Sequence, residues 1–298
     1  MTFKLTGIIP PLTTPFTQNG EVDENGLKAL IEFQIQGGSS ALFICGTYGS
    51  GPVMDEAERC QVHHLATKFV AGRIPVVAHI GSPSTALSVR LTKDAQDADV
   101  DAVASVPPYY YKHDEKTILE YFRAIVNATD LPVYVYNNPG ASGNPITPKL
   151  LKELSNLGVK GIKDSSFSFI QFSNFVNSMT ENPDFNFVIG TEALALPAYL
   201  IGATGCVSGL ANAFPEFMNY FWSVIMDGDY KKASEIQLKV AKAREILHIP
   251  ESTNAACYAV LRERGIDVGY PKKPVLDVEQ DLAERMLLSF RELGILDQ

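Results

Sequence analysis

The stretch Val159-Lys160-Gly161-Ile162-Lys163-Asp164-Ser165-Ser166 combines a short apolar strand with a lysine near its end. A lysine normally stays in water, because burying an unpaired ammonium group is costly. If Lys163 is desolvated, it loses its proton more easily and can attack a ketone to form a Schiff base. The alternative is a surface lysine paired with Asp164. The rest of the chain decides between these two interpretations.

The composition predicts a folded protein without nucleic acid or a membrane as its partner. Hydrophobic residues make up 46% of the 298 residues and the formal net charge is −9, whereas nucleic acids and anionic membranes attract basic surfaces. No apolar run approaches the roughly 20 residues that span a bilayer. The first 16 residues lack the unbroken apolar core of a signal peptide, so we expect a cytoplasmic protein.

The four cysteines are far apart and form no CxxC pair. This spacing predicts neither a zinc site nor a disulfide framework. We therefore expect no metal site, and the Gly-rich turn that binds dinucleotide cofactors is also missing.

Apolar and β-branched runs recur along the chain with amphipathic segments between them, which is typical of parallel strands buried on both faces. The expected strands are Gly7–Pro11, Ala41–Cys45, Pro75–Ile80, Ala102–Val106, Pro132–Tyr136, Val159–Lys163, Phe185–Ile189 and Ala203–Ser208. The expected helices between them include Asp23–Gln36, Met54–Val70, Thr85–Ala95, Glu115–Asn127 and Pro148–Leu157.

Eight alternating strand–helix units predict a (β/α)8 TIM barrel, with an open doubly wound sheet as the alternative fold. After the eighth strand, Phe214–Met226, Asp229–Leu247 and Leu282–Leu293 have helical periodicity. We therefore expect a barrel over residues 1–213 and a C-terminal helical extension over residues 214–298 that packs on the barrel.

Polar and reactive side chains follow the predicted strands, at the end of the barrel where active sites form. These segments are Gly46–Gly51, Pro107–Tyr111, Tyr136–Gly140 and Gly190–Glu192, together with Lys163 itself. Tyr136 and Lys163 end neighbouring strands, so both should point into the same opening.

Four motifs in this order resemble the dihydrodipicolinate synthase/N-acetylneuraminate lyase superfamily. They are GTxG after the second strand, PPYYY after the fourth, YNxPG after the fifth and GIKDSS at the sixth. The resemblance extends from GIIPPLTTPF near the N-terminus to GATGCVSGLAN after the seventh strand.

The resemblance implies a Schiff-base aldolase that acts on pyruvate and an aldehyde, without a metal or an organic cofactor. It implies that Lys163 forms the Schiff base and that Tyr136 moves protons to and from the intermediates. Thr47 would link this phenol to Tyr110, a residue that the family usually contributes across a dimer interface, within a dimer of dimers. Thr47 and Tyr48 would donate hydrogen bonds to the pyruvate carboxylate.

Departures from the synthase pattern concern the second substrate. Ala141 stands where the synthase branch has an arginine that binds a carboxylate, and Tyr48 replaces a second threonine. Ser50 also stands where the glycine loop of the synthase and lyase branches has a glutamate. We therefore expect a 2-keto-3-deoxy sugar acid aldolase. The residues expected to contact its substrate, besides Thr47 and Tyr48, are Ser142, Asn144, Gly190, Thr191, Glu192, Val207 and Ser208.

Several alternatives stay open. Within the superfamily they are a dihydrodipicolinate synthase-like or N-acetylneuraminate lyase-like reaction, and a dehydratase that uses the same Schiff base. A non-catalytic sugar-acid binding protein needs no buried nucleophile. A metal-dependent hydrolase needs clustered histidine and acidic ligands, and of the five histidines only His79 lies near a strand end.

Overall fold

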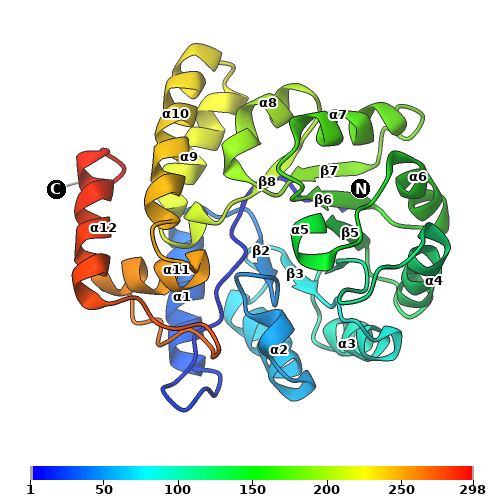
Figure 1. Ribbon diagram of the computed structural model, residues 1–298, viewed down its shortest axis with the longest axis horizontal. Coiled ribbons are helices and arrows are strands. Elements are labelled where there is room, and N and C mark those ends of the chain that lie inside the picture. Colours follow the sequence, from blue (N-terminus) through cyan, green and yellow to red (C-terminus); the bar gives the residue numbers. More distant parts are fainter. Residues whose placement is uncertain (1–2, 297–298) are drawn as a thin grey trace.

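The computed structural model describes residues 3–296, and its centre is an eight-stranded parallel barrel (Figure 1). The strands are β1 (Gly7–Ile9), β2 (Leu42–Ile44), β3 (Val76–His79), β4 (Ala102–Ser105), β5 (Val133–Asn137), β6 (Gly161–Asp164), β7 (Asn186–Ile189) and β8 (Gly205–Val207). Each strand pairs with the next in sequence from β2 to β8, and β8 pairs with β1. A parallel bridge between Pro11 and Phe43 joins the β1 and β2 ends. The predicted TIM barrel is confirmed.

Helices surround the barrel and continue beyond it (Figure 1). They are α1 (Glu24–Gln36), α2 (Glu56–Val70), α3 (Thr85–Asp97), α4 (Glu115–Val126), α5 (Pro139–Ser142), α6 (Pro148–Leu157), α7 (Phe169–Ser178), α8 (Ala195–Leu200), α9 (Pro215–Met226), α10 (Tyr230–Leu247), α11 (Thr253–Glu263) and α12 (Gln280–Glu292). The stripe expected on α1 from Leu27 to Gln34 is buried. Asp23 begins this helix by accepting hydrogen bonds from the first-turn amides.

Successive side chains along each strand point to opposite sides of the barrel wall, which separates two apolar layers. On β2, Phe43 faces the inside of the barrel, whereas Leu42 and Ile44 pack in the outer layer under the helices. On β6, Ile162 belongs to the outer layer. Lys163 therefore points to the inside.

Besides the short α5, the helices for which the sequence gives no predicted bounds are α7, α8 and α11, and the last two lack an amphipathic pattern of useful length. α11 is buried from Ala255 to Leu261, so it has no polar face that would give a helical period. α8 has six residues, which is less than two turns. Neither leaves an amphipathic signal of useful length.

The C-terminal helices flank one side of the barrel in Figure 1. α9 packs against both β1 and α10, so it also covers the barrel. The predicted division at residues 213 and 214 stays a prediction. Over residues 3–296, none of the helices has the length and hydropathy that crossing a membrane requires.

Candidate active site

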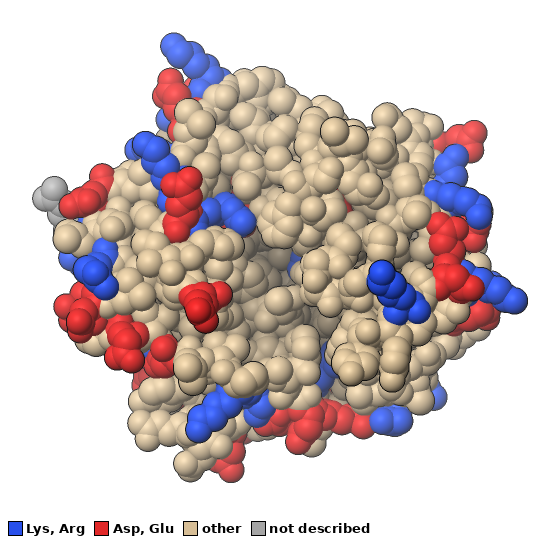
Figure 2. Space-filling view, in the orientation of Figure 1, with Lys and Arg blue, Asp and Glu red and all other residues tan. Residues whose placement is uncertain are grey.

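A cavity of about 150 Å³ opens at the carboxyl ends of the strands. Figure 2 shows this face hollowed near its centre, between the C-terminal helices and α5. The lining residues are Pro11, Thr47, Tyr48, Tyr136, Asn138, Lys163, Ser165, Phe167, Gly190, Glu192, Val207, Gly209, Arg244, His248 and Thr253. The structure thus brings Thr47, Tyr48, Tyr136, Lys163, Gly190, Glu192 and Val207 of the predicted set together.

Lys163 lies beside Tyr136 because the two residues are register partners on β6 and β5. Its Nζ atom is 3.7 Å from the ring centroid of Tyr136 and 3.8 Å from that of Phe43. Burial lowers the pKa of Lys163, and the Tyr136 phenol opposes part of this effect. A lowered pKa increases the fraction of the neutral amine, which is the nucleophilic form.

Asp164 does not pair with Lys163, because neighbouring residues on a strand point to opposite faces. Its carboxylate accepts hydrogen bonds from the Asn137 side chain at 2.7 Å and from the Ser166 hydroxyl at 2.8 Å. Burial raises the pKa of Asp164. The interpretation of Lys163 as a surface lysine paired with Asp164 is therefore wrong.

Tyr136 is the buried phenol of the cavity. Burial raises its pKa, but the nearby Lys163 and hydrogen bonds from Thr47, Ser165 and Asn138 outweigh burial, so the net pKa is lowered from 10.0. The Asn138 amide donates to the phenol oxygen at 3.1 Å. A phenol with a lowered pKa gives up and recovers a proton more readily near neutral pH.

The turn after β2 contributes Thr47 and Tyr48 to the lining of the cavity. Ser50 donates its N–H to Thr47 and Gly51 donates to Gly46, which folds the segment back on itself. At Gly51 a Cβ atom would lie 1.8 Å from the Cys45 carbonyl oxygen, so glycine is required. Within residues 3–296, the N–H groups of Thr47 and Tyr48 donate to no protein acceptor. They are available to a carboxylate.

Glu192 is buried, and its carboxylate is paired. One oxygen accepts a hydrogen bond from Arg244 Nη1 at 2.7 Å, and the other accepts from the Gly209 N–H at 3.1 Å. Gln237, seven residues before Arg244 on α10, donates to the Glu192 backbone carbonyl at 3.0 Å. These contacts tie α10 to the loop after β7.

Four of the predicted substrate-contact residues do not line the cavity. Asn144 bonds to the Pro108 and Tyr111 carbonyls and to the His113 N–H. The Ser142 hydroxyl donates to the Asn138 carbonyl. Their substrate contacts stay predictions, and here their polar groups serve the protein itself.

The other two residues cap short turns. Thr191 accepts a hydrogen bond from the Ala193 N–H at 3.3 Å, and Ser208 accepts from the Ala211 N–H at 3.2 Å. Both side chains are buried. Such hydroxyl–backbone bonds are the usual use of Ser and Thr at turns, and they leave the predicted substrate contacts untested.

Tyr110 lies outside the cavity of this single chain. Its side chain is 86% exposed, and its ring contacts Tyr111 edge-on at a centroid distance of 5.0 Å. Its φ of 82° is unusual for a residue with a side chain. Its predicted role requires a second subunit and stays a prediction.

Sequence reasoning missed several residues that line the cavity, among them Arg244 and His248 on and beside α10, Thr253 on α11, and Phe167. In the sequence, Arg244 is far from any predicted strand end. A search limited to residues that follow strands therefore does not find it. Asn138 and Ser165 stand beside predicted residues in the YNxPG and GIKDSS motifs. Those two could have been found from the motifs.

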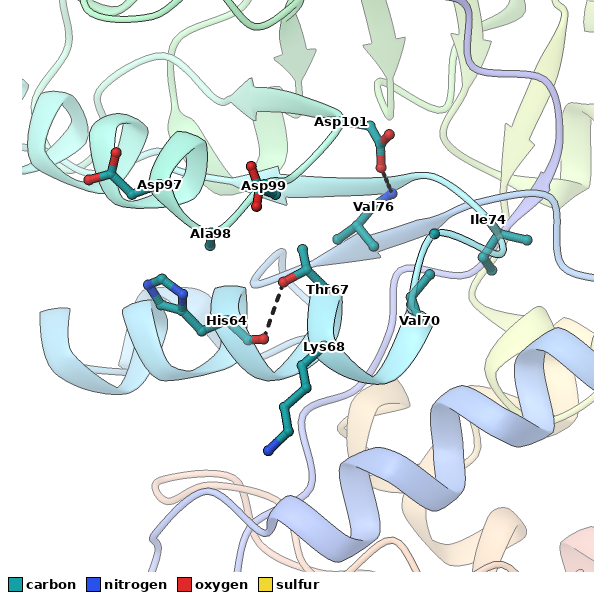
Figure 3. Close-up of a pocket in the computed structure, with 11 residues that line it drawn as sticks. His64, Thr67, Lys68, Val70, Ile74, Val76, Asp97, Ala98, Asp99 and Asp101 are labelled. Atoms are coloured by element: carbon teal, nitrogen blue, oxygen red, sulfur yellow. Dashed lines mark hydrogen bonds between the residues drawn. The ribbon is translucent and has the colours of Figure 1, made fainter.

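A second cavity, of about 440 Å³, lies at the opposite end of the barrel (Figure 3). Its Asp101 carboxylate accepts the Val76 N–H at 2.7 Å, and the Thr67 hydroxyl bonds to the His64 carbonyl. The Lys68 side chain points away from the aspartates in Figure 3. This cavity has no nucleophile paired with an acid–base group, and such amino-terminal faces usually serve stability.

The region of residues 3–296 contains no group of three or more His, Cys, Asp or Glu side chains placed to hold a metal ion. Within that region, His79 accepts the Val106 N–H at 3.4 Å and lies 3.2 Å from the Cys45 carbonyl. Burial lowers the pKa of His79 well below its usual value, so the ring is neutral.

Comparison with known proteins gives matches over nearly the whole chain. Residues 4–289 match the Dihydrodipicolinate synthetase family. The chain is 31% identical to a 4-hydroxy-tetrahydrodipicolinate synthase of Desulfotalea psychrophila, over 98% of both chains. It is 33% identical to the enzyme of that name from Rhizobium meliloti, over 97% of this chain and 99% of the other.

Solved structures give the same result. The prophage protein YagE from E. coli K12, of the dihydrodipicolinic acid synthase family and in complex with pyruvate, has a TM-score of 0.94 at 26% identity. That match covers 98% of this chain and 99% of YagE. A dihydrodipicolinate synthase from Bacillus anthracis has a TM-score of 0.92 at 28% identity, and all of both chains is covered.

Proposed function

Because this chain belongs to the dihydrodipicolinate synthetase family, we propose that it joins pyruvate to an aldehyde through a Schiff base on Lys163. Members of the family are pyruvate-dependent lyases that work through a lysine–pyruvate Schiff base and no metal. The assignment to Lys163 rests on one observation, the buried amine 3.7 Å from the ring of Tyr136. Among residues 3–296, no other lysine lines the cavity.

The chemistry follows from these groups. The neutral Lys163 amine adds to the pyruvate ketone, and the carbinolamine loses water as Tyr136 supplies a proton. The Tyr136 phenolate left by this step takes a proton from the pyruvate methyl, and the iminium accepts the electron pair of the broken C–H bond. The enamine carbon then attacks the aldehyde, and Tyr136 protonates the new alkoxide. Water finally releases the product and restores the amine.

The amides of Thr47 and Tyr48 would hold the pyruvate carboxylate during these steps. Both residues line the cavity, and within residues 3–296 neither N–H donates to a protein acceptor. Held there, pyruvate would present its ketone to Lys163, and the positioning itself lowers the barrier.

The names of the relatives favour a 4-hydroxy-tetrahydrodipicolinate synthase-like condensation over the predicted sugar acid cleavage. Such a reaction uses an aldehyde that carries a carboxylate, such as aspartate semialdehyde. The pairing of Glu192 with Arg244 supports this choice, because Glu192 then brings no uncompensated negative charge to the cavity. Sugar acid cleavage stays the second candidate, because Ala141 on α5 supplies no cation.

Borohydride trapping tests the proposal. Reduction in the presence of pyruvate should fix one pyruvate on Lys163, which is located by mass spectrometry of the peptides. Lys163→Arg should fold but trap nothing, because a guanidinium stays protonated. Labelling of another lysine would overturn the mechanism.

A further inference from the structure

The cavity contains a second cationic side chain whose role the reaction above does not explain. Arg244 reaches the cavity from α10, on the side formed by the loop after β7 and the C-terminal helices. Its side chain is 17% exposed, so its charge is partly shielded from water. Its pair with Glu192 balances this charge, so an anion would be held mainly by hydrogen bonds from the N–H groups that Glu192 leaves free.

The contacts of Arg244 leave part of its guanidinium free. One N–H donates to Glu192 at 2.7 Å, and Nη2 lies 3.4 Å from His248 Nε2. A guanidinium has five N–H groups. Within residues 3–296 the contacts of this side chain thus engage two of them, and the others can meet a ligand.

The neighbours of Arg244 hold the group in place. Glu192 is itself fixed by the Gly209 N–H, and the Phe167 ring centroid lies 5.8 Å from the guanidinium carbon. His248 has a lowered pKa because of burial and the nearby Arg244, so it adds no competing charge. The side chain is therefore preorganised, which limits the entropy lost on binding.

From this geometry, and relying on the proposed function, we propose that Arg244 binds the carboxylate at the far end of the aldehyde substrate. Arg244 on α10 would then bind this carboxylate, which the methyl side chain of Ala141 on α5 cannot do. Pyruvate occupies the Thr47–Tyr48 side of the cavity, and the aldehyde lies between Lys163 and α10. The substrate class is a short aldehyde that carries a carboxylate.

The test compares two acceptors at saturating pyruvate, aspartate semialdehyde and the neutral glyceraldehyde. Arg244→Gln should raise the KM for the semialdehyde roughly ten- to a hundredfold, the loss of a charged hydrogen bond. The KM for glyceraldehyde should change by less than about threefold. Equal changes for both acceptors, or no change for the semialdehyde, would overturn the proposal.

A second variant gives a change of opposite sign. Glu192→Gln leaves the charge of Arg244 uncompensated, so the KM for the semialdehyde should fall. If the Arg244–Glu192 pair only stabilised the structure, both variants should raise the KM for the semialdehyde. Arg244→Gln alone leaves Glu192 as an unpaired buried carboxylate and can fold poorly for that reason. The double variant R244Q/E192Q avoids this problem and should show the same high KM for the semialdehyde. Lys242→Gln, on an exposed position of the same helix, is the matched control and should change neither KM.

A binding readout separates this proposal from the catalytic one. After reduction with pyruvate, wild-type enzyme should bind butyrate at least about tenfold more tightly than reduced Arg244→Gln. Equal binding refutes the role of Arg244 while the trapped Lys163 still supports the Schiff base. If wild-type enzyme traps no pyruvate, the proposed function fails instead, and this inference fails with it.

Discussion

At the scale of single residues, the chemistry depends on how Lys163 is desolvated. Its amine lies against the rings of Tyr136 and Phe43 and not against Asp164. The sequence predicted the lysine and its neighbouring tyrosine, because both end strands with motifs of their own. It could not predict Arg244, since a helix position reaches the cavity only through the packing of α10.

The lowered pKa of Lys163 predicts a pH dependence of trapping. The neutral amine is the nucleophile, so the rate of pyruvate trapping should rise with pH through the lowered pKa. It should level off below pH 10.5, the usual lysine value. The check is a trapping-rate profile by intact mass, and a midpoint at or above pH 10.5 contradicts the desolvated amine.

The same shift predicts a stability effect with a defined sign. The unfolded chain binds a proton at this site that the folded chain gives up more readily, so wild-type stability should rise with pH relative to Lys163→Met. This gain lies between the lowered pKa and pH 10.5. Paired urea unfolding curves measure it, and a difference that does not vary with pH is the contrary result.

Removing the Tyr136 hydroxyl tests the proton transfer. Tyr136→Phe should lower kcat by roughly 10² to 10⁴-fold, the usual effect of losing a positioned acid or base. The ring that packs over Lys163 remains, so folding should change little. Steady-state kinetics and thermal unfolding measure the two effects, and turnover within a few-fold of wild type would assign the proton to another group.

At the scale of elements, the recurring apolar runs predicted all eight strands, whereas the bounds of α7, α8 and α11 were not predicted, and α8 and α11 lack an amphipathic pattern of useful length. α11 is buried over most of its length, and the six residues of α8 are too few for a period. The sequence also gave no sign that Asn144 joins two loops. That role depends on the Pro108 and Tyr111 carbonyls coming within 2.8 Å of its side chain.

This junction predicts a stability effect without a catalytic one. Asn144→Ala should cost about 1 to 3 kcal/mol, because it removes hydrogen bonds to buried backbone groups. Pyruvate trapping should persist. Chemical denaturation compared with the exposed Asn177→Ala measures the effect. A normal stability with a raised aldehyde KM would instead support the predicted substrate contact of Asn144.

At the scale of the whole molecule, one chain leaves a predicted catalytic residue in solvent. Tyr110 is exposed and Thr47, its predicted partner in the relay, is exposed as well, so the relay needs a group from elsewhere. The dimer of dimers expected from the family resemblance would supply it. The predicted role of Tyr110 therefore depends on the predicted oligomeric state.

Mixing one impaired and one inactive variant tests this arrangement. Tyr110→Phe should lower kcat, and Lys163→Arg should abolish turnover. In a mixed dimer, the subunit that carries Tyr110→Phe keeps Lys163 and receives an intact Tyr110 from its Lys163→Arg partner, so one of the two sites works. Random reassociation of equal amounts should therefore restore about a quarter of wild-type activity, since about half of the dimers are mixed and each has one working site. If each site used the Tyr110 of its own chain, no mixed dimer would hold a complete site. The activity would then stay at the average of the two separate variants, and Tyr110 would have to reach Thr47 within its own subunit.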